Sequence, residues 1–152
     1  MTDPLAFAST TPRLSLPLLH VGQAQKEVTV NEAVLRADAL LHAVVQGAAD
    51  GPPTSPAEGD SWIVGSAATG EWAGHAGDLA HFAGGAWLFT SPREGMAVFD
   101  ASADQTTRYS NGWQYASAPV QPAGGITVDT EARDAIAGLV TALVAAGVLP
   151  DS

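Results

Sequence analysis

The chain has 152 residues, of which 46% are hydrophobic and 14% are charged. This composition is typical of a folded protein, and the length fits one domain or a small domain with helical appendages. A net charge of −10 with six Lys and Arg residues excludes a direct nucleic-acid partner, because binding phosphate requires cations. The chain has no cysteine, which excludes disulfides and thiolate chemistry.

We predict an extended N-terminal arm over residues 1–15, because Pro4 and Pro12 lie among several Ser and Thr residues. Such an arm is expected to become ordered only when something binds it. The first residues lack the charged and apolar regions of a signal peptide, and no apolar run approaches the length of a membrane span. We therefore expect a chain made in the cytoplasm, with no membrane partner.

The sequence predicts a helical attachment and assembly segment over residues 16–50. Apolar residues recur at alternating intervals of four and three, which is the spacing of a seam that packs against another helix. These residues are Val30, Val34, Ala37, Leu41 and Val44. A helix that lies on its own domain is the alternative interpretation, since most periodic helices of this length are core helices.

Residues 51–120 predict a small antiparallel β-domain. A loop rich in Pro and Gly, GPPTSPAEGD, is followed by short segments of strand character separated by Gly, Pro, Asn or Asp. The segments are 61–64, 78–82, 86–89, 96–100, 107–110 and 113–116. Two stretches, HFAGGAWLF and TRYSNGWQY, both predict a hairpin whose second strand opens on tryptophan. Two copies alone do not establish a repeat architecture.

Residues 121–152 predict a linker and a C-terminal oligomerisation helix. Asp129 is the expected N-cap, Gly147 the left-handed residue after the helix, and Pro150 prevents its continuation. A second seam with the same spacing follows Ala132, Ile136, Leu139 and Leu143. The predicted fold is therefore α+β: a small antiparallel β meander flanked by an N-terminal amphipathic helix and a C-terminal oligomerising helix.

The sequence offers little catalytic chemistry. His75 and His81 are six residues apart, a spacing that fits no compact metal site, and the acidic residues of the β-region occur mainly in predicted turns. A carboxylate pair for glycoside cleavage is the enzymatic alternative. The sequence has no nucleophile elbow, P-loop or dinucleotide fingerprint. We therefore expect no enzyme, with no catalytic residue, cofactor or metal.

Tryptophans provide the alternative binding chemistry. Trp72, Trp87 and Trp113 are candidates for stacking on sugar rings, while the other interpretation makes them the large side chains of a small core.

Two sequence stretches carry a resemblance. LPLLHVGQAQKEVTVNEAVLRADALL and the segment from Ser55 to Asp100, with its EGD, WAGH and GGAW elements, resemble a family of uncharacterised domains. The family occurs in virion proteins of tailed phages and alphaproteobacterial gene transfer agents, including tail fibre and head spike subunits. The resemblance implies that residues 22–33 belong to an assembly surface.

The resemblance implies a structural virion protein, located in the virion, that serves as a spike base or fibre-attachment subunit in host attachment. Its expected partners are its own copies, as a trimer or pentamer, and other capsid, tail or fibre proteins. The alternative function is a carbohydrate-binding adhesin module that contacts host capsule or surface polysaccharide.

Overall fold

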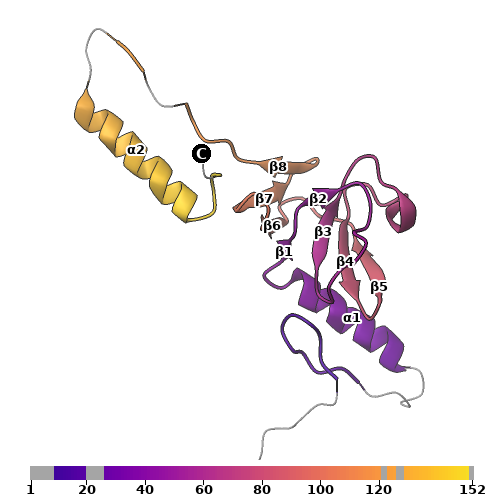
Figure 1. Cartoon of the computed structure of the whole chain (residues 1–152). Helices are drawn as coiled ribbons and strands as arrows, with labels where there is room; N and C mark the ends of the chain where they lie inside the picture. Colours follow the sequence, from indigo (N-terminus) through magenta and orange to yellow (C-terminus); the bar gives the residue numbers. More distant parts are fainter. Residues whose placement is uncertain (1–8, 20–25, 121–122, 126–128, 151–152) are drawn as a thin grey trace, which may run out of the picture.

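The computed structural model describes residues 9–19, 26–120, 123–125 and 129–150 (Figure 1). It confirms the α+β class, with two helices and two small mixed sheets. The helices are α1 (Lys26–Leu40) and α2 (Thr130–Ala145), and a short 3-10 turn, η1, spans Gly70–Trp72. The strands are β1 (Val44–Val45), β2 (Ala48–Ala49), β3 (Ser61–Val64), β4 (Leu79–Ala83), β5 (Ala86–Thr90), β6 (Ala97–Asp100), β7 (Gln105–Tyr109) and β8 (Trp113–Tyr115).

All six predicted strands are confirmed as β3 to β8, and they pair in antiparallel ladders. The prediction of a purely antiparallel meander is incomplete. Strands β1 and β2 add a parallel edge to each ladder, which gives the sheet orders β1-β6-β7-β8 and β2-β3-β4-β5. Each has two residues, which is too short to produce an alternating pattern in the sequence.

The two sheets contain two copies of one structural unit, here named the first unit (residues 56–90) and the second unit (residues 92–115). Each opens on a Pro-x-Glu-Gly sequence, continues as a strand and closes with a hairpin. In the first unit, Gly59 N donates to Phe82 O at 2.8 Å. In the second, Gly95 N donates to Tyr109 O at 2.9 Å. The similarity that the sequence shows between the two hairpins therefore extends to the opening turn and first strand of each unit, while the loop that carries η1 belongs to the first unit alone.

The glutamate of each unit holds the tip of its own hairpin. Glu58 accepts the backbone N–H groups of Gly84 and Gly85, at 2.7 and 2.9 Å. Glu94 accepts the backbone N–H of Asn111 at 2.8 Å. Gly84, Gly85 and Asn111 at these tips have positive φ angles, which Gly and Asn adopt more readily than other residues.

Both units attach to the same stretch of chain, residues 43–49, here named the central segment. Phe99 N and Ala101 N donate to Ala43 O and Val45 O, both at 2.9 Å. Ile63 N donates to Gly47 O at 3.0 Å, and Gly65 N to Ala49 O at 2.7 Å. The two units thus make equivalent hydrogen bonds with the central segment, and the acceptors used by one unit lie four residues along the chain from those used by the other. The two units lie on either side of this segment.

Two apolar clusters form the core. The first joins both units through Val45, Ile63, Leu79 and Val98, all buried. The second, formed by Val64, Trp72 and Ala80, lies under the loop that carries η1. The central segment and the two units, here named the β-module (residues 43–115), therefore form one packed body, in which Val45 of the central segment is fully buried.

The N-terminal helix is shorter than the sequence predicts. The predicted helical segment 16–50 is wrong at residues 16–19, which are not helical and where Pro17 forms a β-bridge with Thr10. It is also wrong beyond Leu40, because the chain turns at His42 with a φ of 48° and enters β1. The predicted seam therefore divides between two kinds of structure, since Leu41 follows the helix and Val44 lies in β1. Of the proposed assembly surface 22–33, residues 22–25 lie outside the described residues.

The described part of the N-terminal arm, residues 9–19, folds back on α1. Asp38, buried in α1, accepts hydrogen bonds from Thr11 Oγ1 at 2.7 Å, Arg13 N at 3.0 Å and Leu14 N at 2.8 Å. The Arg13 guanidinium donates to the carbonyls of Asp38, Ala39, Leu41 and His42, which caps the helix end. The expectation that the arm, residues 1–15, needs a partner to become ordered is wrong for residues 9–15, while residues 1–8 lie outside the described part. Residues 16–19, which the sequence predicts to be helical, continue the same folded-back segment.

The C-terminal helix matches its predicted boundaries. Asp129 caps its N-terminus by accepting a hydrogen bond from Ala132 N at 2.9 Å. At the other end Gly147 takes a φ of +66°, while Val148 N donates to Leu143 O and Gly147 N to Val144 O, both at 2.9 Å. These bonds form a Schellman motif. In Figure 1, α1 lies along the sheet that contains β3 to β5, whereas α2 stands away from both sheets.

Candidate assembly surface

Helix α2 presents an apolar surface that the described part of its own chain leaves uncovered. None of its residues is buried, and the side chains of Leu139 and Ile136 are 61% and 44% exposed. Of the other predicted seam residues, Ala132 is exposed and Leu143 is half-buried. Residues 135–150 include no charged residue. A helix of this composition is normally covered by neighbours, because hydration of its apolar surface costs free energy.

The C-terminal end of α2 is nevertheless attached to the second unit. Thr106 N of β7 donates to Gly147 O at 2.6 Å, and Leu149 is buried, with 7% exposure. A groove of about 360 Å³ lies beside this attachment, and it is lined by Phe99, Asp104 and residues 144–147. The attachment fixes where α2 leaves the β-module.

The predicted seam of α1 faces solvent for most of its length. Val30 and Leu41 are 41% and 49% exposed, Ala37 is exposed, and Val34 is half-buried. This helix is held instead by the buried Ala39 and by polar residues. Arg36 Nη1 donates to Phe89 O at 2.6 Å, and Asn31 exchanges two hydrogen bonds with the backbone of Leu19. The apolar spacing of α1 therefore did not identify the side that contacts the domain.

The tryptophans do not form one sugar-stacking platform. Trp72 is completely buried, so its prediction as a stacking residue is wrong. It packs edge to face against Trp87, with ring centres 5.1 Å apart, and Trp62 joins the same cluster. Trp113 belongs to the other cluster and donates from Nε1 to Gly77 O at 3.0 Å. The sequence could not reveal this separation because it does not show which sheet face each side chain occupies.

Trp87 and Trp113 occupy equivalent positions in the two units. Trp87 is the second residue of β5 and Trp113 is the first residue of β8, and each pairs across its hairpin with an aromatic residue. Trp87 lies 5.0 Å from Phe82 and Trp113 lies 5.5 Å from Tyr109, between ring centres. Both are half-buried. Cross-strand aromatic pairs of this kind stabilise hairpins.

His75 and His81 serve separate local structures. His75 Nδ1 lies 3.0 Å from Asp78 Oδ2, and its ring stacks on Phe89 with centres 3.6 Å apart. His81 Nδ1 lies 2.9 Å from Ser61 Oγ, and both of those residues are buried. Within the described ranges, no three His, Asp or Glu side chains gather in a group able to hold a metal ion.

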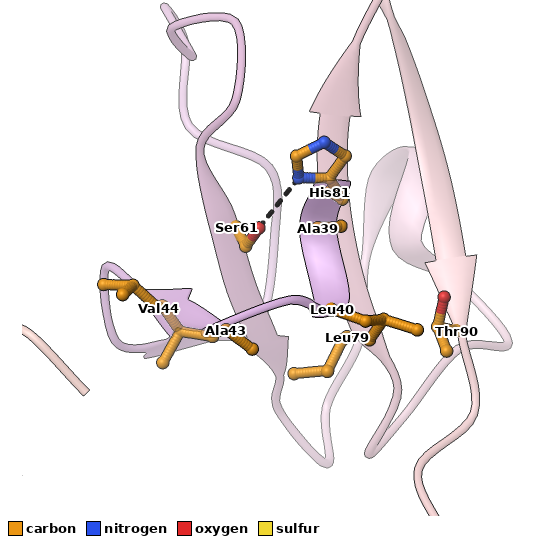
Figure 2. A pocket seen from close by; sticks show the side chains of 9 residues that line it. Ala39, Leu40, Ala43, Val44, Ser61, Leu79, His81 and Thr90 are labelled. Carbon is orange, nitrogen blue, oxygen red and sulfur yellow. Dashed lines mark hydrogen bonds between the residues drawn. The ribbon is translucent and has the colours of Figure 1, made fainter. Parts of the chain in front are cut away.

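A small cavity adjoins His81 beneath the end of α1 (Figure 2). Its volume is about 10 Å³, and Ser61, Leu79 and Thr90 line it together with residues of the helix end. This volume holds a single water molecule and no larger ligand.

Burial lowers the pKa of His81 below its usual value of 6.5, although the nearby Asp38 carboxylate opposes the shift. The folded state therefore favours the neutral ring. We expect the free energy of unfolding to be largest above pH 6.5 and to fall as the pH drops below that value towards the lower pKa of the folded protein. Urea unfolding at pH 7.5 and 5.5 measures this difference. The difference in unfolding free energy between the two pH values should be smaller in His81→Gln. An unchanged difference would contradict the assignment of this pH dependence to His81.

Asp100 and Tyr115 form a polar contact inside the second unit. Tyr115 Oη donates to Asp100 Oδ2 at 2.6 Å, while Ser102 N and Ser102 Oγ donate to Asp100 Oδ1. Burial alone would raise the pKa of Asp100, but these hydrogen bonds outweigh it and lower the pKa. Burial and the Asp100 carboxylate raise the pKa of Tyr115 to about 12. The pair therefore stays as carboxylate and phenol at neutral pH and closes the β6–β7 turn.

The chain belongs to the family described as "Protein of unknown function (DUF2793)", whose model matches residues 30–114, more than half of the chain. The match contains the central segment and ends within β8, before α2 begins. A comparison with curated proteins finds no match. Among the described residues, neither helix has the length and apolar character needed to cross a membrane.

Proposed function

We propose that this chain is a structural virion protein of a phage or gene transfer agent, a spike base or fibre-attachment subunit that assembles as a symmetric homo-oligomer of three or five copies. The observation that carries the proposal is the uncovered apolar surface of α2, in a chain with few charged residues. Obligate interfaces have this composition because they resemble the interior of a domain. The virion context comes from the sequence resemblance alone.

The division of the chain into two parts supports a role in attachment. The β-module has its own core and holds α1 and the described arm, so it is a stable body that other virion proteins can contact. Helix α2 touches this body at its C-terminal end and extends away from it. One part would display a surface, while the other would join the copies.

Light scattering of the full chain at micromolar concentration tests the assembly. We expect a mass of three or five chains, and a monomeric variant when Leu139→Glu places a charge on the exposed apolar side. Thr141→Glu is the matched control, because Thr141 is exposed on the opposite side of the helix and should leave the mass unchanged. A wild-type chain that is folded and monomeric would refute the assembly.

The virion context needs a separate measurement. Quantitative mass spectrometry of purified particles should find the chain at a fixed copy number, and antibody labelling should place it at the head vertices or at the tail. Absence of the chain from the particles would refute a virion role even if the chain oligomerises.

The second candidate function is a carbohydrate-binding adhesin. It rests on the half-exposed rings of Trp87 and Trp113, since Trp72 is inaccessible. Binding to host polysaccharide that Trp87→Ala abolishes, with the oligomer intact, would favour this function. The pairing of Trp87 and Trp113 with aromatic residues across their own hairpins favours a structural role for these two tryptophans.

A further inference from the structure

The apolar surface of α2 has two sides of different shape. At about 100° of rotation per residue, Ile136 and Leu143 share one side, here named the large side. Gly138, Ala142 and Ala145 share another, here named the small side, about 140° away around the helix axis. Leu139 lies between them. Two dissimilar sides suit a head-to-tail contact repeated around a ring better than the single self-complementary patch of a two-fold dimer.

Most of these two sides is exposed, although Leu143 is half-buried. Ile136 and Leu139 are among the exposed large hydrophobic residues, and a Cβ added at Gly138 would meet no atom of the described residues within 4 Å. A glycine inside a helix is unfavourable by about 0.5–1 kcal/mol, and close approach of another backbone is a physical reason for it. The opposite side of the helix, which contains Arg133 and Ala137, is half-buried. There the Arg133 guanidinium donates to Gly124 O.

The charges of α2 indicate the direction of the partner. Arg133 borders the large side, whereas two acids lie on or beside the small side: Glu131, one heptad before Gly138, and Asp134. When the large side of one helix meets the small side of a parallel copy, Arg133 and Asp134 lie at the same height across the contact, and Glu131 lies less than one turn away. An antiparallel copy would instead place Arg133 near Ala145, where no charge is available. Charge complementarity therefore selects a parallel second copy as the occupant.

We infer that α2 forms a parallel ring of at least three copies of this chain, in which Ile136 and Leu143 of one copy pack on Gly138 and Ala142 of the next. Arg133 of one copy pairs with the next copy's Asp134 on the outside of the ring. This inference rests on the proposed assembly and defines its packing. Because Gly147 and Leu149 hold the end of each helix on its β-module, all β-modules sit at one end of the ring.

Disulfide crosslinking tests the contact between unlike sides, and the absence of native cysteine makes every new thiol unique. Leu143→Cys and Ala142→Cys chains with different affinity tags are expressed together and oxidised. We expect crosslinked dimers that contain both tags, and little crosslinking when either variant is expressed alone. Ala137→Cys, at the centre of the outer side, is the control and should stay monomeric under denaturing electrophoresis when it is expressed together with Leu143→Cys. Strong crosslinking of Leu143→Cys with itself would overturn the ring.

A charge exchange tests the direction of the helices. Arg133→Asp places two acids across each contact, so the concentration for half-assembly should rise severalfold. The double variant Arg133→Asp and Asp134→Arg should restore assembly, although it also lacks the contact between Arg133 and Gly124. An oligomer without mixed crosslinks or charge rescue would overturn the ring and leave the proposed assembly standing. A monomeric wild-type chain would refute both.

Discussion

Trp72→Ala is expected to destabilise the β-module by about 3–5 kcal/mol, because it removes a large side chain that is completely buried. Trp72 packs against both Trp62 and Trp87, with ring centres 6.2 and 5.1 Å apart. Its loss leaves a cavity that the short η1 turn cannot fill. Since a domain of this size has a total stability of roughly 5–15 kcal/mol, a large part of the folding free energy depends on this residue. Urea unfolding followed by circular dichroism measures the loss.

The conservative change Trp72→Phe provides the control. It keeps most of the buried ring and removes the indole N–H, which finds no acceptor among the described residues. We expect a loss of about 1–2 kcal/mol, clearly smaller than for alanine. Equal, small losses in both variants would mean that Trp72 is not part of the core. That outcome would restore it as a candidate for sugar stacking.

Asp38→Ala is expected to cost about 2–4 kcal/mol and to release the N-terminal arm. The carboxylate accepts hydrogen bonds from Thr11 Oγ1, Arg13 N and Leu14 N, and the change leaves these donors without their acceptor. Trypsin provides a direct readout because Arg13 is a cleavage site within the arm. Each 1.4 kcal/mol raises the open population tenfold, so cleavage after Arg13 should accelerate by more than about tenfold.

Glu32→Ala is the matched control for this measurement. Glu32 is an acidic residue of the same helix, but its side chain is 48% exposed and pairs with Arg36 on the surface. An exposed pair of this kind contributes about 0–1 kcal/mol. Cleavage after Arg13 should therefore keep its wild-type rate. Equal acceleration in both variants would show that the arm responds to global destabilisation and not to Asp38.

Local chemistry explains which elements the sequence predicted correctly. The start and end of α2 depend on Asp129 and Gly147, which act within a few residues of their own positions. The hairpins at Gly84 and Asn111 are likewise set by turn residues that must adopt positive φ. Such features are visible in a sequence because the interacting groups are neighbours along the chain.

Elements that depend on distant partners were missed or assigned to the wrong role. Val44 continued an apolar spacing, yet it pairs with Phe99, which is 55 residues further along the chain. The contacts of α1 come from Asp38 and Arg36, polar residues that an apolar pattern ignores. The sequence alone does not distinguish Trp72 from an exposed tryptophan. Its burial depends on the fold of the loop around it.

The arrangement of both units around the central segment also limits how the protein can evolve. Residues 43–49 supply the edge strand for each sheet, so deleting or exchanging one unit would expose backbone donors and acceptors on that side of the segment. Neither unit is an independent module for recombination, although both share one architecture. Sequence divergence between the units is therefore free to adapt their outer faces separately, while the pair is inherited as a whole.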